Sequence, residues 1–422
     1  MPKPFPKPLP KFIAFAPPPV GEEEIKGIIK TIGSGWLTKG PKTEIFEEKM
    51  AQYLKAEETV AVSSCTAALH LALRAMGLGP SDGVITTPIT FVSTVHAIVY
   101  TGAWPFLCDI DPVDGNLSPE RVIEFLENNC SINNQNYPVH RKTGRIIKAI
   151  LPVHYGGFPA NLKKFQAICQ GYNLHLLEDA AHALGASYQG KRIGSSQLFK
   201  ELPIQQHRMV AFSFYATKNL TTGEGGLLSG DEDLLAKCRT LSSYGISDSR
   251  RIWGRYSKKG TYRYDVDCLG FKNNFTDIQA AIGIAQLAKF DKLQKKRLEF
   301  ARIYTETLAP LGKLIKLHPE NYEESAWHLY PIRPNFARLN LHKDTFMDKL
   351  KNLNIGASVM FIPVHTFSYY RKLLKLLPET YPESLKFYRS VISLPMSPVH
   401  SLQTISDVAL AIKELILWAK RK

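Results

Sequence analysis

The chain has 422 residues, 44% of them hydrophobic, so it can bury a large core and has room for two or three domain-sized units. It carries 53 basic and 38 acidic side chains, a net charge of +15. The basic residues are spread out and no nucleic-acid-binding motif accompanies them, so a nucleic-acid partner is not expected. A solvated basic surface and a positive field for an acidic, phosphorylated substrate both remain open.

The predicted elements begin with a proline-rich arm over residues 1–19, a helix from Glu22 to Thr31 and a glycine-rich turn to Pro41. Short apolar runs then alternate with helical ones. The expected strands are Thr59–Val62, Gly83–Thr87, Trp104–Asp109, Ile146–Val153, Leu174–Glu178 and Val210–Phe214, and helices are expected at Ala67–Met76 and Val92–Tyr100. This alternation predicts an α/β fold with a mostly parallel sheet covered by helices on both faces.

Three more polar stretches, 128–145, 197–208 and 247–261, are interpreted as surface loops or insertions. Residues 277–308 are expected to form one or two long helices, and 405–420 an amphipathic final helix. We predict an arm over 1–19, a large cofactor-binding domain over 20–285 and a small C-terminal domain over 286–422.

Cysteine usage and the N-terminal sequence indicate a cytoplasmic protein. Six cysteines are scattered along the chain without a CxxC pair, which is typical of reduced thiols and gives no metal-binding pattern. The N-terminal arm is broken by prolines and lacks the apolar stretch of a signal peptide. The longest uncharged run, Val84–Cys108, also contains prolines, so no membrane insertion is expected.

Ser63-Ser64-Cys65-Thr66 separates a predicted strand from a predicted helix. Exposed amides at a helix N-terminus, with hydroxyls beside them, suit a phosphate, although an ordinary helix cap has the same residues.

Glu178-Asp179-Ala180-Ala181-His182 follows another predicted strand. A carboxylate at the carboxyl end of a parallel strand lies where such sheets bind ligands, and a helix-capping aspartate is the alternative. If Asp179 is buried, its charge needs a partner, and a protonated pyridine nitrogen would supply one.

Lys218 stands in Ser213-Phe-Tyr-Ala-Thr-Lys218-Asn-Leu-Thr-Thr-Gly-Glu-Gly-Gly226, where an apolar strand gives way to a glycine-rich loop. A lysine at such a junction can be desolvated, which lowers the pKa of its amine and favours Schiff-base chemistry. Phe91 is either a core aromatic or an aromatic face for a ring, and His154-Tyr-Gly-Gly157 is either a site segment or a turn. A phosphate cradle, a carboxylate, an aromatic face and a lysine are together what pyridoxal phosphate requires.

The sequence resembles the DegT/DnrJ family of nucleotide-sugar aminotransferases, within the aspartate-aminotransferase fold (fold type I). The segments that carry the resemblance span residues 13–400 and are SGWLTKGPKTEIFEE, SSCTAALHLAL, ITFVSTVHAI, LPVHYGGFPAN, LEDAAHALGA, FSFYATKNLTTGEGG, GFKNNFTDIQAAIGIAQL, AWHLYPIR and FIPVH. The opening SGWLT and the PVHYGG segment look closest to enzymes that aminate UDP-linked 4-keto-arabinose or UDP-4-keto-hexoses.

The resemblance implies a role for each matching residue. Lys218 would form the Schiff base and shuttle the proton, Asp179 would pair with the pyridinium nitrogen, Phe91 would stack on the ring, and His182 would lie near the ring hydroxyl. Cys65, Thr66 and Ser213 would hold the phosphate, with Asn274 reaching it from the partner subunit of a homodimer. Weaker candidates for substrate contact are Thr38, Lys39, His328 and His365.

Two residues depart from the family pattern. Cys65 stands where glycine or alanine is usual, which predicts a tighter phosphate cradle, and Met360 replaces a common histidine, which puts one sugar contact in doubt. Some relatives exchange the lysine for histidine and are dehydratases, whereas this chain keeps Lys218.

The expected function is transfer of an amino group from L-glutamate, which becomes 2-oxoglutarate, to a nucleotide-linked 4-keto sugar, with UDP as the expected nucleotide, in lipid A, polysaccharide or other amino-sugar synthesis. A sugar dehydratase and a non-catalytic regulator that retains the fold are the alternatives. The sugar, the carbon aminated and the pathway are left open by the sequence.

Overall fold

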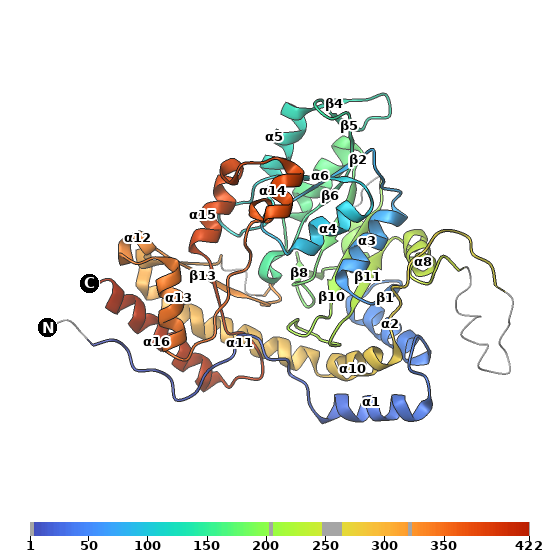
Figure 1. Ribbon diagram of the computed structural model, residues 1–422. Coiled ribbons are helices and arrows are strands. Elements are labelled where there is room, and N and C mark those ends of the chain that lie inside the picture. Colours follow the sequence, from blue (N-terminus) through green and yellow to red (C-terminus); the bar gives the residue numbers. More distant parts are fainter. Residues whose placement is uncertain (1–3, 202–205, 247–263, 320–322, 422) are drawn as a thin grey trace.

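The computed structural model describes residues 4–201, 206–246, 264–319 and 323–421. In these ranges a central sheet of nine strands has the order β1-β11-β10-β7-β6-β2-β3, with the β4–β5 hairpin joined to β6 (Figure 1). Strands β10, β7, β6, β2 and β3 are parallel neighbours, and β11 runs antiparallel between β1 and β10. The strands are β1 (Thr59–Val62), β2 (Asp82–Thr86), β3 (Trp104–Leu107), β4 (Cys130–Ile132), β5 (Pro138–His140), β6 (Ile146–Leu151), β7 (His175–Asp179), β10 (Arg208–Ser213) and β11 (Gly226–Gly230).

Helices cover both faces of this sheet because its strands carry apolar side chains on both faces. On β10, Met209 and Ala211 pack in one hydrophobic cluster, and Val210 and Phe212 pack in another. The first cluster lies under α3 (Cys65–Ala75), α4 (Val92–Tyr100) and α8 (Glu232–Leu241). The opposite face is covered by α2 (Pro41–Leu54), α5 (Pro119–Asn129), α6 (Leu162–Tyr172) and α7 (Ser196–Glu201).

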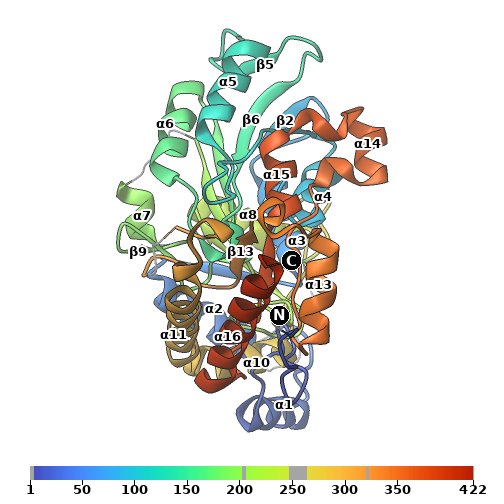
Figure 2. The same cartoon turned by 90° about the vertical axis from the view of Figure 1, so that its left-hand side faces the viewer.

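A second, antiparallel sheet is formed by β12 (Ile315–Leu317), β13 (Tyr330–Pro334) and β14 (Ile392–Leu394). Figure 2 shows it beside the helices of the C-terminal part, which share one apolar cluster with it. The later helices are α10 (Asp277–Ala288), α11 (Phe290–Leu308), α12 (Phe336–Leu339), α13 (Lys343–Asn352), α14 (Ser368–Leu374), α15 (Pro382–Ser390) and α16 (Leu402–Ala419). Short 3-10 turns are η1 (Tyr155–Gly157), η3 (Ala309–Leu314), η4 (Val364–Thr366) and η5 (Pro378–Thr380). A small separate hairpin consists of β8 (Ser187–Tyr188) and β9 (Lys191–Arg192).

The proline-rich arm packs along the C-terminal part before it reaches α1 (Glu22–Ser34) (Figure 1). Ile13 forms a parallel bridge with Ile355, and its amide donates to the carbonyl of Asn354 at 2.8 Å. Further along, the hydroxyl of Ser397 donates to the carbonyl of Pro17. The arm therefore contributes to the packing of the second sheet's domain.

The predicted α/β architecture is confirmed, with three differences in detail. Residues 197–201, part of a stretch expected as a surface loop or insertion, belong to α7, where Leu198 is buried, and Arg208 at the end of that stretch begins β10. Residues 128–145, expected as a loop, contain β4 and β5, whose backbone groups pair in a hairpin. Strand β11 was not expected, because its sequence Gly-Leu-Leu-Ser-Gly follows a glycine-rich loop. The polar stretch 247–261 lies outside the described residues, as do residues 202–205 of the second stretch, and the domain boundary at 285 stays a prediction.

Candidate active site

Asp179 is the last residue of β7 and only 4% of it is exposed. Its Oδ2 accepts a hydrogen bond from the hydroxyl of Thr94 on α4 at 2.7 Å, and its Oδ1 accepts one from the amide of Ala181 at 3.1 Å. Burial raises the pKa of this carboxyl, and the two hydrogen bonds oppose that rise. Asp179 makes no ion pair with any of the described residues, so this buried carboxylate can take a cationic partner.

Lys218 is half-buried in the turn that follows β10, where its amide donates to the carbonyl of Tyr215 at 2.9 Å. Burial lowers the pKa of its amine to about 8 from an ordinary 10.5, although Cys65 and Asp179 favour the charged form. At pH 7 roughly one lysine in ten is then neutral, which makes the amine a competent nucleophile. Lys218 therefore lies at the junction of β10 and the glycine-rich loop, and its proposed role stays a prediction.

The N-terminus of α3 presents backbone amides to the same region. The side chain of Ser64 caps the helix by accepting from the amide of Ala67 at 3.1 Å. The first amides of a helix have no intrahelical acceptor, so those of Cys65 and Thr66 suit an anion. A Cβ at Gly226 would lie 2.4 Å from the carbonyl carbon of Ser64, so only glycine lets β11 approach this turn.

The side chains of Ser213 and Cys65 belong to the other predicted phosphate contacts. Ser213 ends β10, with its hydroxyl accepting from the amide of Tyr215 at 3.4 Å. Cys65 is buried, its sulfur lies 3.9 Å from the carbonyl of Ala211, and burial raises the pKa of its thiol. The thiol of Cys65 is therefore neutral where it borders the predicted phosphate site.

Two buried histidines lie next to each other, with ring centroids 4.3 Å apart. His182 Nδ1 accepts from the amide of Gly156 at 3.2 Å, so its ring proton resides on Nε2. His328 Nδ1 lies 3.1 Å from Oδ1 of Asn219, whose amide nitrogen donates to the carbonyl of Ala326, so His328 carries its proton on Nδ1. Burial holds the pKa of both rings well below the usual value, and both are neutral.

Phe91 is 60% exposed at the start of α4, so it is not a core aromatic. Its ring lies 6.2 Å from that of Phe361, which stacks on His182 at 5.6 Å. The structure thus brings Phe91 and His182 to one aromatic wall.

Asn274 lies beside the turn that carries Thr38 and Lys39. Its side-chain amide donates to the hydroxyl of Thr38 at 3.4 Å and to the carbonyl of Phe275 at 3.0 Å. Thr38 is exposed and Lys39 is buried.

Asp277, which the sequence analysis did not single out, fixes this turn. Its carboxylate accepts from the amides of Gly40, Lys42 and Thr43 at 2.8–3.0 Å, and so caps α2 from the start of α10. The sequence gives no signal for a cap supplied by a residue more than 230 positions away.

His365 is placed elsewhere. It is fully buried in η4, its Nε2 lies 2.8 Å from the carbonyl of Pro378, and its ring packs on Tyr381. These contacts do not join it to Lys218, Asp179 or the two neutral histidines.

These groups fit pyridoxal phosphate by their chemistry. The α3 amides suit its phosphate, unpaired Asp179 suits a protonated ring nitrogen, and Lys218 supplies an amine of low pKa. The fold and the site together define a pyridoxal-phosphate enzyme of the aspartate-aminotransferase fold.

Comparisons with known proteins identify the family. The DegT/DnrJ/EryC1/StrS aminotransferase family matches residues 18–413. The chain is 39% identical over 410 residues to the spore coat polysaccharide biosynthesis protein SpsC of Bacillus subtilis. This match covers 97% of this chain and 98% of SpsC.

Two solved structures are similar over nearly their full length. PseC of Helicobacter pylori, an aminotransferase involved in pseudoaminic acid biosynthesis, has a TM-score of 0.81 at 27% identity, covering 96% of this chain and 100% of PseC. The PLP form of the putative sugar aminotransferase Spr1654 from Streptococcus pneumoniae has a TM-score of 0.77 at 26% identity, covering 95% of this chain and 99% of Spr1654. The chain belongs to the DegT/DnrJ/EryC1/StrS family and is an aminotransferase whose cofactor is pyridoxal phosphate.

Among the described residues, no helix combines the length and the apolar character needed to cross a bilayer.

Proposed function

We propose that the enzyme transfers an amino group from L-glutamate to the ketone of a nucleotide-linked 4-keto sugar, with UDP as the nucleotide. The observation that carries the amino transfer is that Lys218, whose amine has a pKa of about 8, lies within the electrostatic influence of Asp179, which is buried and makes no ion pair with the described residues, in a chain of this family. SpsC is named for spore coat polysaccharide biosynthesis and PseC for pseudoaminic acid biosynthesis, which supports a sugar substrate.

Bound pyridoxal phosphate supplies an electron sink for the carbon that gains or loses the amino group. In the proposed site Lys218 would hold the cofactor and, as a free amine, would move a proton at Nζ, which the pKa near 8 makes feasible at neutral pH. Asp179 would accept a hydrogen bond from the protonated ring nitrogen, and neutral His182 would serve the side of the ring that carries the hydroxyl. The amides of Cys65 and Thr66, with Ser213, would hold the phosphate.

The substrate assignment rests on charge and on the turn before α2. The net charge of +15 favours an anionic substrate such as a nucleotide diphosphate. Asp277 holds the turn that presents Thr38 and Lys39, and we assign these two residues, with His328, to substrate contact. All six cysteines lie in the described ranges and none forms a disulfide, which supports the proposed cytoplasmic location.

The test is a half-reaction. The enzyme is loaded with pyridoxamine phosphate and mixed with a panel of UDP- and TDP-linked keto sugars, while its visible absorbance is followed. We expect a UDP-4-keto sugar to restore the visible band and to yield an amino sugar. A panel in which every sugar leaves the spectrum unchanged would refute the proposed substrate class, and release of a dehydrated sugar instead would favour the dehydratase.

We also propose a homodimer in which Asn274 contacts the cofactor phosphate of the partner subunit. Ile25, Ile29 and Ile32 form an exposed apolar stripe on α1, each more than half exposed. Helix α1 packs against α10, which directly follows the Asn274 segment. A second copy covering the stripe would therefore approach the Asn274 segment as well.

Mixing two inactive variants, Lys218→Ala and Asn274→Asp, is expected to restore activity once subunits exchange. Asn274→Asp places a carboxylate against a phosphate, and the like charges repel. In a shared site, a mixed dimer has one pocket with both defects and one with neither, so up to about a quarter of the parent activity per site returns at equal mixing. The measurement is activity against mixing time, and each variant mixed with itself is the control. Persistently absent activity, with exchange confirmed by labelled subunits, would show that Asn274 serves its own subunit.

A further inference from the structure

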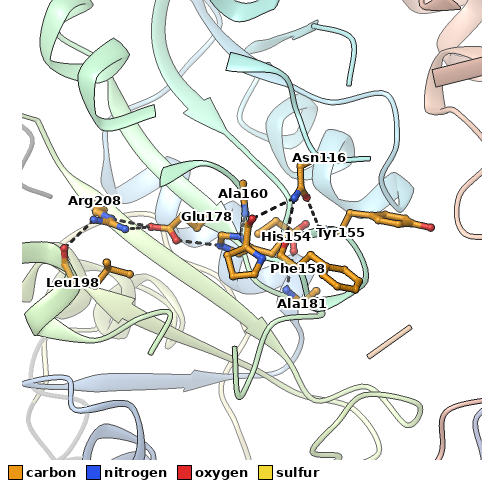
Figure 3. A network of polar contacts seen from close by, with 11 residues as sticks. Asn116, His154, Tyr155, Phe158, Ala160, Glu178, Ala181, Leu198 and Arg208 are labelled. Atoms are coloured by element: carbon orange, nitrogen blue, oxygen red, sulfur yellow. Dashed lines mark hydrogen bonds and ion pairs between the residues drawn. The ribbon is translucent and has the colours of Figure 1, made fainter. Parts of the chain in front are cut away.

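A buried polar network joins Glu178, Arg208 and His154 (Figure 3). Glu178 and His154 are fully buried and Arg208 is 3% exposed. Consecutive strand residues point to opposite faces, so Glu178 faces away from α4 while Asp179 faces toward it. Arg208 pairs with Oε1 of Glu178 through Nε at 2.8 Å and Nη2 at 2.7 Å, and His154 Nε2 lies 3.1 Å from Oε2.

The hydrogen bonds define the charges in this network. His154 Nδ1 accepts from the amide of Ala160 at 2.9 Å, so the ring is neutral and donates from Nε2 to Glu178. Burial opposes ionisation of Glu178, and Arg208 and His154 outweigh it, which holds the pKa of this carboxyl below the usual value. Glu178 and Arg208 are therefore a charged pair, with His154 as a directed donor.

His154 begins a turn that contacts the Asp179–His182 segment on one side and the segment next to His328 on the other. Its amide donates to the carbonyl of Asp179 at 3.0 Å. Two residues on, the amide of Gly156 donates to His182, and the carbonyl of Gly156 accepts from Leu329 at 3.0 Å, next to His328. A Cβ at Gly157 would lie 2.9 Å from the carbonyl oxygen of His182, which shows how closely the turn is fitted.

We propose that Glu178 is a positioning residue for amino transfer: through His154 it holds the turn whose Gly156 amide orients His182, and it balances the charge of Arg208 behind Asp179. If glutamine replaced Glu178, its single amide oxygen would stay with the charged Arg208 and its NH2 group would face the Nε2–H of His154, so the ring would lose the acceptor that fixes its tautomer and orientation. The Gly156 amide and His182 then lose their fixed geometry. The inference rests on the proposed roles of His182, Asp179 and Lys218.

The test uses Glu178→Gln, which keeps the shape of the side chain and removes its charge. We expect kcat to fall about tenfold with a smaller change in KM, because misplaced groups slow the chemical step. The visible band of the cofactor-loaded enzyme is expected to titrate at a pH lower by ~0.5, because the unbalanced Arg208 cation disfavours a protonated nitrogen at Lys218. The other titratable groups around Lys218 are Cys65, Asp179, His182 and His328, and the variant leaves them unchanged.

The double variant Glu178→Met/Arg208→Met separates position from charge, because it leaves His154 without an acceptor and removes both charges, and it also covers the case in which the single variant fails to fold. Neutralising both partners of a buried pair is better tolerated than removing one. We expect its pH midpoint to return toward that of the parent while kcat stays low.

The matched control is Glu47→Gln, which breaks another ion pair of the same domain, between buried Glu47 and half-buried Arg239 at 2.7 Å. It is expected to lower the melting temperature and leave kcat and the pH midpoint unchanged. If the Glu178 variants also changed only the melting temperature, Glu178 would be merely structural and the proposal wrong. A parent enzyme without a cofactor band would instead refute the proposed roles of Lys218 and Asp179, so the two failures are distinguishable.

Discussion

Replacement of Lys218 by alanine is expected to reduce amino transfer by a factor on the order of 10³ or more, because the variant has neither a covalent attachment point nor a proton carrier for the cofactor. The amides of α3 and the carboxylate of Asp179 remain, so the variant should still bind pyridoxal phosphate without a covalent link. Turnover and the visible absorbance of the loaded enzyme measure the two effects separately.

The control is Lys237→Ala, which removes an exposed lysine of α8 in the same domain and should leave both readouts unchanged.

The pH dependence gives a second check on Lys218. Because only the neutral amine attacks a carbonyl, capture of cofactor by the cofactor-free parent should accelerate with pH and level off above about 8, the pKa of Lys218. Amination by Lys218→Ala at near the parent rate would contradict the assigned role.

Local sequence signals were enough to predict most elements of the sheet. Strand β1 and helix α4 have the predicted bounds, because each is an apolar segment between clear breaks. Strand β11 was missed because its glycines resemble the preceding loop and because one of its two pairing partners, β1, is distant in sequence. The β4–β5 hairpin was missed because a hairpin at the margin of a sheet needs little apolar sequence.

The residues of the candidate site likewise divide into those that a local sequence pattern predicts and those that only contacts between distant segments reveal. Lys218 and Asp179 were predicted because strand ends in an α/β sheet are informative positions. The roles of Asp277 and Glu178 depend on contacts with the α2 turn and with Arg208, and no local pattern reports such contacts. For Phe91 the local pattern was misleading, because its sequence neighbourhood favours burial and its side chain is exposed.

Asp179→Asn is expected to lower kcat about 10²-fold, equivalent to about 3 kcal/mol of transition-state stabilisation. In its proposed role the carboxylate would stabilise a protonated ring nitrogen, and a neutral amide would not. A deprotonated nitrogen withdraws fewer electrons, so the chemical step slows while substrate contacts elsewhere are unchanged. The measurement is kcat and KM for the half-reaction with glutamate.

The fold should tolerate this substitution. Oδ1 of the asparagine can still accept from the amide of Ala181, and its amide nitrogen can donate to the hydroxyl of Thr94. Thr94 then donates to Thr90, whose hydroxyl lies 2.6 Å away and can serve as donor or acceptor. The melting temperature should therefore stay close to that of the parent.

Thr94→Val is the matched control, because it removes the 2.7 Å hydrogen bond to Asp179 and keeps the charge. A neutral-to-charged hydrogen bond is worth about 2 kcal/mol, and part of that loss is offset when the charge pairs with the ring nitrogen, so we expect a reduction in kcat of only a few-fold. If the asparagine variant kept the parent rate, Asp179 would serve only as a link between β7 and α4. Equal, large losses in both variants would assign the effect to the hydrogen bond and not to the charge.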